Sequence, residues 1–246
     1  GIFLKQTAQV FPNWLEAIPH PQVSVGKFCT PIRIEMVVRG YLCGHAWRIY
    51  RDGGRSICGV NLPEGLQEHS AFDQAILTPT LKLDNGHDQD ISSEEILNQG
   101  LVPPEVYKAM EQASLNLYRA GHAYAKTRGL VLLDTKYEFG MHEQNLLLMD
   151  EIHTPDSSRY AYADGFGPGK PIKQLSKEFV RHWLIDRGFQ GLEGQQMPSM
   201  EENDVWQIRE RYLELFEQLT GNKPACRAPI GAGELLDLIA ACLETK

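Results

Sequence analysis

The segment from residue 130 to residue 159 constrains the fold of this chain more than any other stretch. Between residues 130 and 140, Asp134, Lys136 and Glu138 occupy every second position, so an extended strand places all three charges on one side. The other parity is expected to face a core and consists of Val131, Leu133, Thr135, Tyr137 and Phe139. A short polar turn and a second apolar run follow, which together predict a β-hairpin with a charged face.

The second arm of this hairpin, residues 146–152, carries Asp150 near its end. Residues 154–157 then have the composition of a tight turn that presents Asp156 and Arg159. Two carboxylates on paired strands suit a divalent ion, because magnesium takes oxygen ligands and commonly bridges to phosphate. A solvated sheet face with cross-strand ion pairs produces the same spacing, so the pattern alone leaves both interpretations open.

Composition narrows the class of protein. With 246 residues and 42% hydrophobic content, the chain can bury one large core or two lobes. Its formal net charge of -8 argues against a nonspecific nucleic-acid partner or an anionic membrane. The five cysteines are scattered without a Cys-x-x-Cys pair, which favours free thiols over a zinc site. No stretch has the apolar length of a membrane span, and a cytoplasmic location is expected.

A second strand is predicted over residues 31–40, where Glu35 and Arg39 share the face opposite the apolar positions. They suit either a salt bridge on an edge strand or a pocket wall that carries a carboxylate and a guanidinium. Gly40 and Gly44 then surround a compact turn before a short helix, whose amino terminus could cradle an anion.

Three helices have clear boundary signals. A capping box from Ser92 to Glu95 starts a short helix, and the acidic residues before it are either caps or, at Asp88, a candidate ligand. Pro104 opens the longest helix, which ends at Gly129 and leads directly into residue 130, so an α/β or α+β layer is expected.

The third of these helices is expected to be capped by Ser176 and to end at Gly188. It places Lys177 and Arg181 on one face, either as a solvated cationic stripe or as a phosphate-binding pair. Two further packing helices are expected, one before Gly221 and one after Gly233.

Taken in chain order, these motifs resemble the SAICAR synthetase family of purine biosynthesis. The resemblance covers nearly the whole chain and rests on six segments, which are residues 35–47, 77–82, 86–92, 134–140, 150–159 and 176–181. It implies a two-lobed α+β fold with an ATP cleft between the lobes. Residues 1–30 would be a remnant of the amino-terminal lobe and the interlobe hinge, and residues 31–246 the ATP- and substrate-binding lobe with carboxy-terminal helices.

The resemblance also implies a reaction. The family uses ATP and Mg²⁺ to join L-aspartate to the carboxylate of carboxyaminoimidazole ribonucleotide, and an acyl phosphate is the expected intermediate because a carboxylate acylates poorly. The partners would be these small molecules, with no nucleic acid or membrane and with a homo-oligomer left open. The alternatives are a truncated, non-catalytic nucleotide-binding protein and a kinase-like phosphotransferase on a related scaffold.

Site roles follow from the same resemblance. The residues expected to act in catalysis are Lys136, Asp134 and Arg159. Those expected to bind substrate are Glu35, Arg39, Gly44, His45, Asp88, Asp156, Ser158, Lys177 and Arg181. Those expected to bind ATP are Lys27, Phe28, Cys29, Lys82, Glu138 and Asp150. Glu138 and Asp150 would hold magnesium, with Glu35 and Asp88 near a second ion.

The chain departs from the family pattern in two places. The family begins with a hairpin containing Gly-Lys that covers the ATP phosphates, and nothing before Gly1 supplies it. We therefore expect further residues ahead of Gly1 rather than an inactive truncation, and a second omitted loop near Phe166 and Gly167. His45 stands where relatives usually carry Ser beside the substrate phosphate, although an imidazole can donate a hydrogen bond there.

Overall fold

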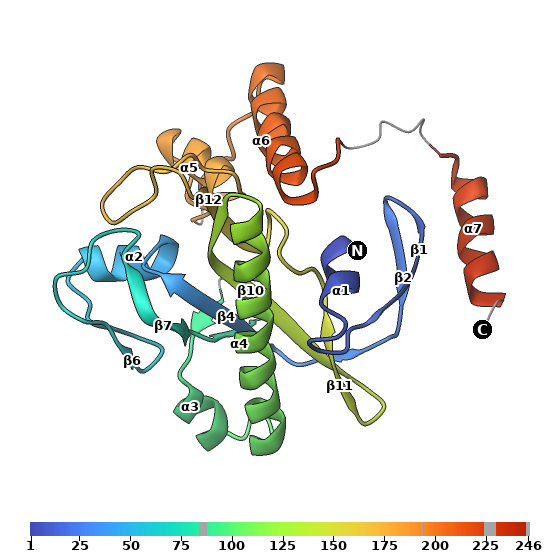
Figure 1. Cartoon of the computed structure of the whole chain (residues 1–246), viewed down its shortest axis with the longest axis horizontal. Helices are drawn as coiled ribbons and strands as arrows, with labels where there is room; N and C mark the ends of the chain where they lie inside the picture. The colour runs from blue at the N-terminus through green and yellow to red at the C-terminus, as the bar shows by residue number, and fades with distance from the viewer. Residues whose placement is uncertain (84–87, 193, 224–229, 245–246) are drawn as a thin grey trace.

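The computed structural model of the chain describes residues 1–83, 88–192, 194–223 and 230–244. Within those ranges, an antiparallel sheet of eight strands forms the centre, with β4 (Ile34–Tyr41) and β10 (Leu130–His142) side by side (Figure 1). The other strands of this sheet are β3 (Thr30–Pro31), β7 (Ala71–Leu77), β8 (Thr80–Leu81), β9 (Gln89–Asp90), β11 (Asn145–Met149) and β12 (Ser158–Tyr162). Together with the helices, the sheet confirms the expected α+β fold class.

The predicted hairpin is formed by β10 and β11, with Glu138 opposite Met149. β12 pairs with the first half of β10, where Arg159 lies opposite Asp134. The second arm is shorter than expected, because β11 ends at Met149 and Asp150 follows it with a left-handed backbone, φ 59°.

The predicted alternation along β10 is wrong in its first half, because the strand contains a β-bulge at Leu133. Leu132 pairs with Tyr160 and Asp134 pairs with Arg159. A step of two residues along β10 therefore matches a step of one residue along β12. Because of the extra residue, the strand residues before Leu133 face the side opposite to the one that simple alternation predicts. Asp134 remains on the same face as Lys136 and Glu138.

Burial follows this change of parity. Leu130 and Leu132, which have the same sequence parity as the charged residues, are fully buried in the core together with Tyr137. Val131 and Leu133, expected inside it, pack instead in a small separate cluster. Beyond the bulge the prediction holds, since Lys136 and Glu138 lie opposite the core face.

One face of the sheet is covered by α4 (Pro104–Thr127), which runs across β4 and β10 (Figure 1). Met110 and Leu117 of this helix are completely buried against Met36 and Val38 of β4 in the main core. Apolar residues at helical spacing and alternate apolar residues on a strand thus meet in one layer. The opposite face of β4 and β10 is left to the charged residues.

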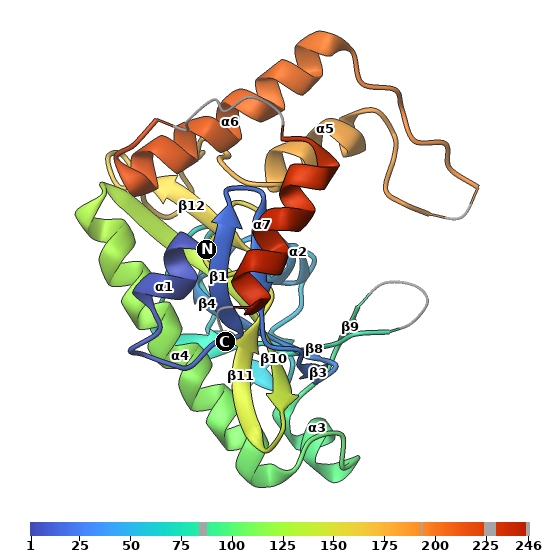
Figure 2. The ribbon, with the colours of Figure 1, turned by 90° about the vertical axis from the view of Figure 1, so that its right-hand side faces the viewer.

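The remaining elements surround this layer. The helices are α1 (Ile2–Gln6), α2 (Gly44–Arg51), α3 (Ser93–Asn98), α5 (Glu178–Asp186), α6 (Glu202–Thr220) and α7 (Ala232–Glu244), and two small sheets pair β1 (Leu15–His20) with β2 (Val23–Gly26) and β5 (Ser56–Ile57) with β6 (Val60–Asn61). Figure 2 shows α5 and α6 beyond β12, and α7 beside β1.

Most predicted helix boundaries are confirmed. The capping box of Ser92 and Glu95 is formed, and Gly221 ends α6 in a left-handed conformation. Ser176 is not the cap of α5, because the helix begins at Glu178 and the Ser176 hydroxyl only accepts the Glu178 N–H at 3.4 Å. Lys177 occupies the cap position instead.

Two further expectations concern thiols and membranes. The cysteines in the described ranges, Cys29, Cys43, Cys58 and Cys242, form no disulfide. Cys226, and residues 86 and 87 of the third family motif, lie outside those ranges. Across the described part of the chain, no helix combines the length and apolar character needed to cross a bilayer.

Candidate active site

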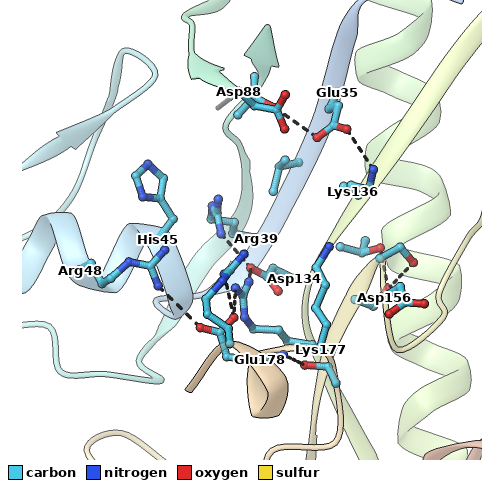
Figure 3. Close-up of a pocket in the computed structure, with 18 of the residues that line it drawn as sticks. Glu35, Arg39, His45, Arg48, Asp88, Asp134, Lys136, Asp156, Lys177 and Glu178 are labelled. Atoms are coloured by element: carbon cyan, nitrogen blue, oxygen red, sulfur yellow. Dashed lines mark hydrogen bonds and ion pairs between the residues drawn. The ribbon is translucent and has the colours of Figure 1, made fainter. Parts of the chain in front are cut away.

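A pocket of about 450 Å³ lies on the face of the sheet opposite α4. The strands β4 and β10 form its floor and contribute Glu35, Arg39, Asp134 and Lys136 to its lining. Alternation places these residues together, because side chains two apart on a strand share a face about 7 Å apart. Figure 3 shows a carboxylate end that contains Glu35 and an arginine end that contains Arg39.

The carboxylate end, defined here as Glu35, Glu138 and Asp150, is neutralised by two lysines. Lys136 Nζ lies 2.9 Å from Glu35 Oε1 and 2.6 Å from Glu138 Oε1, and 3.9 Å from Asp150 Oδ2. Lys82 Nζ lies 2.6 Å from Glu138 Oε2 and 3.4 Å from Glu35 Oε1. Three carboxylates predicted at separate points of the chain therefore converge on two ammonium groups.

The two outer carboxylates differ in their electrostatics. Burial opposes ionisation of Glu138, but hydrogen bonds from Lys136 and Lys82 outweigh it and lower the pKa of Glu138 to about 2. Burial, followed by the nearby charge of Glu138, raises the pKa of Asp150. Glu138 is thus firmly anionic, whereas Asp150 lies where a further positive charge is favourable.

The arginine end is built around Asp134. Its Oδ2 atom accepts hydrogen bonds from Arg39 Nη1 at 2.8 Å and from Arg159 Nη1 at 2.6 Å. Asp134 and Arg39 are almost completely buried, and Arg39 Nε also donates to the Thr78 hydroxyl at 2.8 Å. Asp134 faces the pocket because it lies two residues before Lys136 on the regular part of β10, and the bulge lets Leu132 on its amino-terminal side face the core.

A second buried carboxylate, Glu178 at the start of α5, extends this end. Its Oε2 atom accepts from Arg159 Nη2 at 2.6 Å and from Arg181 Nη1 at 3.0 Å, and Arg48 Nη1 lies 3.6 Å from Oε1. Burial opposes its ionisation, but the guanidinium groups outweigh burial and lower the pKa of Glu178. The arginine end contains more arginines than carboxylates. Its net positive charge can therefore bind an anionic ligand.

The amino terminus of α2 closes one side of the pocket. Gly44 is its first residue and adopts φ 55°, against the guanidinium of Arg159. The next residue, His45, lines the pocket, and its Nε2 atom lies 2.7 Å from Asp90 Oδ2. Asp90 is therefore paired across the pocket and is not only a residue ahead of a helix cap.

The other expected substrate residues also reach the pocket lining. Asp88, Asp156, Lys177 and Arg181 are all found there. Asp156 Oδ1 accepts a hydrogen bond from the Tyr212 hydroxyl at 2.6 Å. Burial and the neighbouring cations lower the pKa of Lys177.

Ser158 lines the pocket too, but its hydroxyl donates to the Thr135 hydroxyl at 2.7 Å and is buried. Three expected nucleotide residues lie elsewhere. Lys27 and Phe28 are exposed, the latter to 87%, and Cys29 is buried beside Gly140. The structure thus brings the substrate residues together with Glu138 and Asp150 close by, and leaves residues 27–29 outside the pocket lining.

Within the described ranges, no group of three or more His, Cys, Asp or Glu side chains is arranged to hold a metal ion by itself. Glu138 and Asp150 nevertheless have the donor chemistry of a nucleotide-bound magnesium ion, which uses one or two carboxylates and the phosphates of the substrate. Burial and, after it, the nearby charge of Glu138 raise the pKa of Asp150, so these two carboxylates favour a further positive charge beside them. They fit a shared, phosphate-bound ion rather than a closed metal cage.

Sequence reasoning missed several residues of the pocket. Arg48, Thr80 and Glu178 line it, and Asp90 was assigned only to capping. Two of them carried a signal, because Arg48 lies one helical turn after Gly44 and Glu178 directly follows the flagged Lys177. Thr80 donates to Glu35 Oε2 at 3.4 Å, a contact that the sequence spacing does not indicate.

Comparison with known proteins supports the family resemblance that the sequence motifs indicate. A family model described as SAICAR synthetase matches residues 2–198. The chain is 55% identical over 226 residues to phosphoribosylaminoimidazole-succinocarboxamide synthase of Bacteroides thetaiotaomicron, covering 90% of this chain and 72% of that protein. The synthase of Bacteroides fragilis is 56% identical over the same length and with the same coverage.

Solved structures agree at the level of the fold. The structure of SAICAR synthase from Saccharomyces cerevisiae, complexed with SAICAR, matches with a TM-score of 0.73 and 29% sequence identity. The match covers 91% of this chain and 79% of the yeast chain.

Proposed function

The chain belongs to the SAICAR synthetase family, and from that premise we propose that it joins L-aspartate to carboxyaminoimidazole ribonucleotide at the expense of ATP. Family membership makes it a ligase of purine biosynthesis. The proposal adds the substrates, the acyl-phosphate intermediate and the residues that serve each step.

One observation carries the proposal, namely that a single pocket floor joins a carboxylate end to an arginine end. Lys136 contacts Glu35 and Glu138, and Asp134, two residues earlier on the same strand face, holds Arg39 and Arg159. A reaction between a triphosphate and an anionic ribonucleotide needs both kinds of surface side by side, because charge neutralisation and alignment limit phosphoryl transfer.

In the first proposed step, a carboxylate oxygen of the ribonucleotide attacks the γ-phosphorus of ATP, and ADP departs. Magnesium, when bound by Glu138 and Asp150, supplies charge neutralisation for the triphosphate. Lys136 and Lys82, which both pair with Glu138, would neutralise the transferring phosphoryl group.

In the second step, the amine of L-aspartate attacks the acyl carbon, phosphate leaves and the nitrogen gives up a proton. Arg39 and Arg159 hold the ribonucleotide while this happens, with Lys177 and Arg181 as further anion contacts. The arrangement contains the cations that an anionic intermediate requires and needs no side-chain nucleophile.

We also propose that residues 1–30 contribute to the adenine side of the nucleotide site and residues 31–246 to the remainder. The exposed Phe28 offers an aromatic surface for that purpose. Asp88, in the pocket lining beside Thr80, is proposed to act with Glu35 near the imidazole carboxylate.

The proposal is tested by ADP release from the purified protein with ATP, magnesium, carboxyaminoimidazole ribonucleotide and L-aspartate. ADP should form in stoichiometric amounts with SAICAR and only when both substrates are present. ADP formation that ignores aspartate would instead indicate a kinase-like phosphotransferase. Nucleotide binding without turnover would indicate a non-catalytic protein.

A further inference from the structure

The turn between β11 and β12, residues 150–157, carries one residue of the carboxylate end and one residue of the pocket lining. Asp150 at its start belongs to the carboxylate end, and Asp156 near its finish lines the pocket. The segment also touches the floor directly, because the Lys136 backbone N–H donates to the Ser157 carbonyl at 3.0 Å. The position of this turn therefore affects where Asp150 and Asp156 lie.

The backbone of the 150–157 turn is held in an uncommon conformation. Asp150 and His153 have φ values of 59° and 57°, in the left-handed region that side chains other than glycine seldom adopt. A residue keeps this backbone conformation only when surrounding contacts hold it there. The indole of Trp14 supplies one contact, by donating to the Asp150 carbonyl at 2.9 Å.

His153 supplies the others. Its ring Nε2 atom lies 2.8 Å from the Tyr137 hydroxyl, and its carbonyl accepts a hydrogen bond from the Tyr160 hydroxyl at 3.0 Å. Tyr137 lies on β10 and Tyr160 on β12, and all three residues are almost completely buried. One residue thus ties the turn to both strands beneath it.

Gly121 of α4 leaves space for the imidazole of His153. A Cβ atom on Gly121 of α4 would lie 2.3 Å from Cε1 of His153, so only glycine leaves room at that point of the helix. The ring Nδ1 atom is buried and makes no hydrogen bond within the described residues. Burial lowers the pKa of His153 to about 3, so the ring is neutral. A buried unpaired nitrogen costs stability, and a purely space-filling residue would avoid that cost.

We propose that His153 is a positioning residue, which fixes the 150–157 turn to Tyr137 and Tyr160 and thereby places Asp150 near Lys136 and Asp156 in the pocket lining. The positioning itself is independent of the reaction, and only its consequence for turnover rests on the proposed function.

Hydrogen exchange of the intact chain tests the positioning without any substrate. Tyr137→Phe removes the ring contact and Tyr160→Phe the carbonyl contact, and each should speed exchange of the turn amides roughly tenfold. The readout includes the amides of Thr154 and Ser158, which are hydrogen-bonded within the turn. The matched control is Tyr118→Phe, which removes another buried hydroxyl, bonded to the Leu132 carbonyl at 2.8 Å.

The control should leave exchange of residues 150–158 at the wild-type rate. Unchanged exchange in both Tyr137→Phe and Tyr160→Phe would overturn the inference, and so would equal acceleration in the control. If one variant fails to fold, the other still decides the outcome.

Steady-state kinetics then separates positioning from stability. At a temperature where all variants are folded, Tyr137→Phe should lower kcat/KM for ATP roughly tenfold, whereas Tyr118→Phe should not. Equal kcat/KM values in these variants would contradict the consequence for turnover. A wild-type protein without ligase activity would refute the proposed function and leave the exchange result to judge the positioning.

Discussion

The guanidinium of Arg159 fills the space in which a side chain on residue 44 would begin. A Cβ atom at Gly44 would lie 2.5 Å from Cζ of Arg159, and the backbone φ there is 55°. Asp134 and Glu178 hold the same guanidinium on its other sides, so it cannot retreat without losing a buried ion pair. The glycine at the start of α2 is therefore a condition for the arginine end of the pocket.

Gly44→Ala should displace Arg159 and raise KM for the ribonucleotide at least roughly tenfold, because a displaced anion contact typically costs about 1.5–3 kcal/mol. KM for ATP should change little. Gly100→Ala is the control, since Gly100 has φ 64° and no atom within 4 Å of the added Cβ. A similar kinetic defect in both variants would assign the effect to backbone strain rather than to Arg159.

Asp150→Asn should lower kcat at least roughly a hundredfold, because it weakens a ligand for the ATP-bound magnesium ion. Thermal stability should stay the same or rise slightly, since the change removes a charge that is disfavoured by partial burial and by the nearby Glu138. Turnover and melting temperature are measured on the same preparation, with the exposed Asp73→Asn as the control for loss of one negative charge. A kcat near the wild-type value would remove Asp150 from the proposed site.

Glu178→Gln keeps the size of the side chain but removes the charge that Arg159 and Arg181 share. KM for the ribonucleotide should rise roughly tenfold and the free energy of unfolding should fall by several kcal/mol, because buried guanidinium groups lose their partner. Glu210→Gln breaks a comparable ion pair with Arg209 on an exposed part of α6 and should do neither. Equal effects of the two substitutions would contradict a special role for Glu178.

The neutral His153 predicts a pH dependence of stability. Its pKa is about 3 in the folded chain and about 6.5 when unfolded. Between these values the unfolded state binds the extra proton, so this contribution is fully present above pH ~6.5 and lost as the pH falls toward 3, at about 1.4 kcal/mol per pH unit.

Urea unfolding at several pH values between 7 and 4 measures this slope, with His153→Gln as the comparison. Carboxylates such as Glu138 and Glu178 titrate in both proteins and cancel in the difference. The wild type should lose stability more steeply than the variant as the pH falls. Parallel curves would show that the imidazole does not titrate on unfolding.

Much of the fold was predictable because alternation and capping are local properties. The face shared by Glu35 and Arg39, the capping box at Ser92 and the helix from Pro104 each depend on neighbours within a few residues. The bulge at Leu133 was not predictable in this way, because the side chains of Val131 and Leu133 look like an unbroken continuation of the pattern.

The pocket lining was predicted where its residues cluster along the chain and missed where they meet only in space. The strand pattern put Asp134 and Lys136 on one charged face, and the family resemblance gave them their roles. The pairing of His45 with Asp90, in contrast, requires β9 to lie across from α2. The buried Glu178 was passed over for its cationic neighbours, since a sequence does not show which member of a charged run turns inward.

The bulge also determines where β10 of this chain tolerates the loss of a residue. Even-numbered residues of β10 face the core before Leu133, and odd-numbered residues face it after Leu133. A protein one residue shorter at this point would keep Leu132 in the core and Asp134 in the pocket. A deletion elsewhere in β10 would move core residues to the pocket face and pocket residues to the core. Leu133 is therefore the position at which β10 tolerates the loss of a residue.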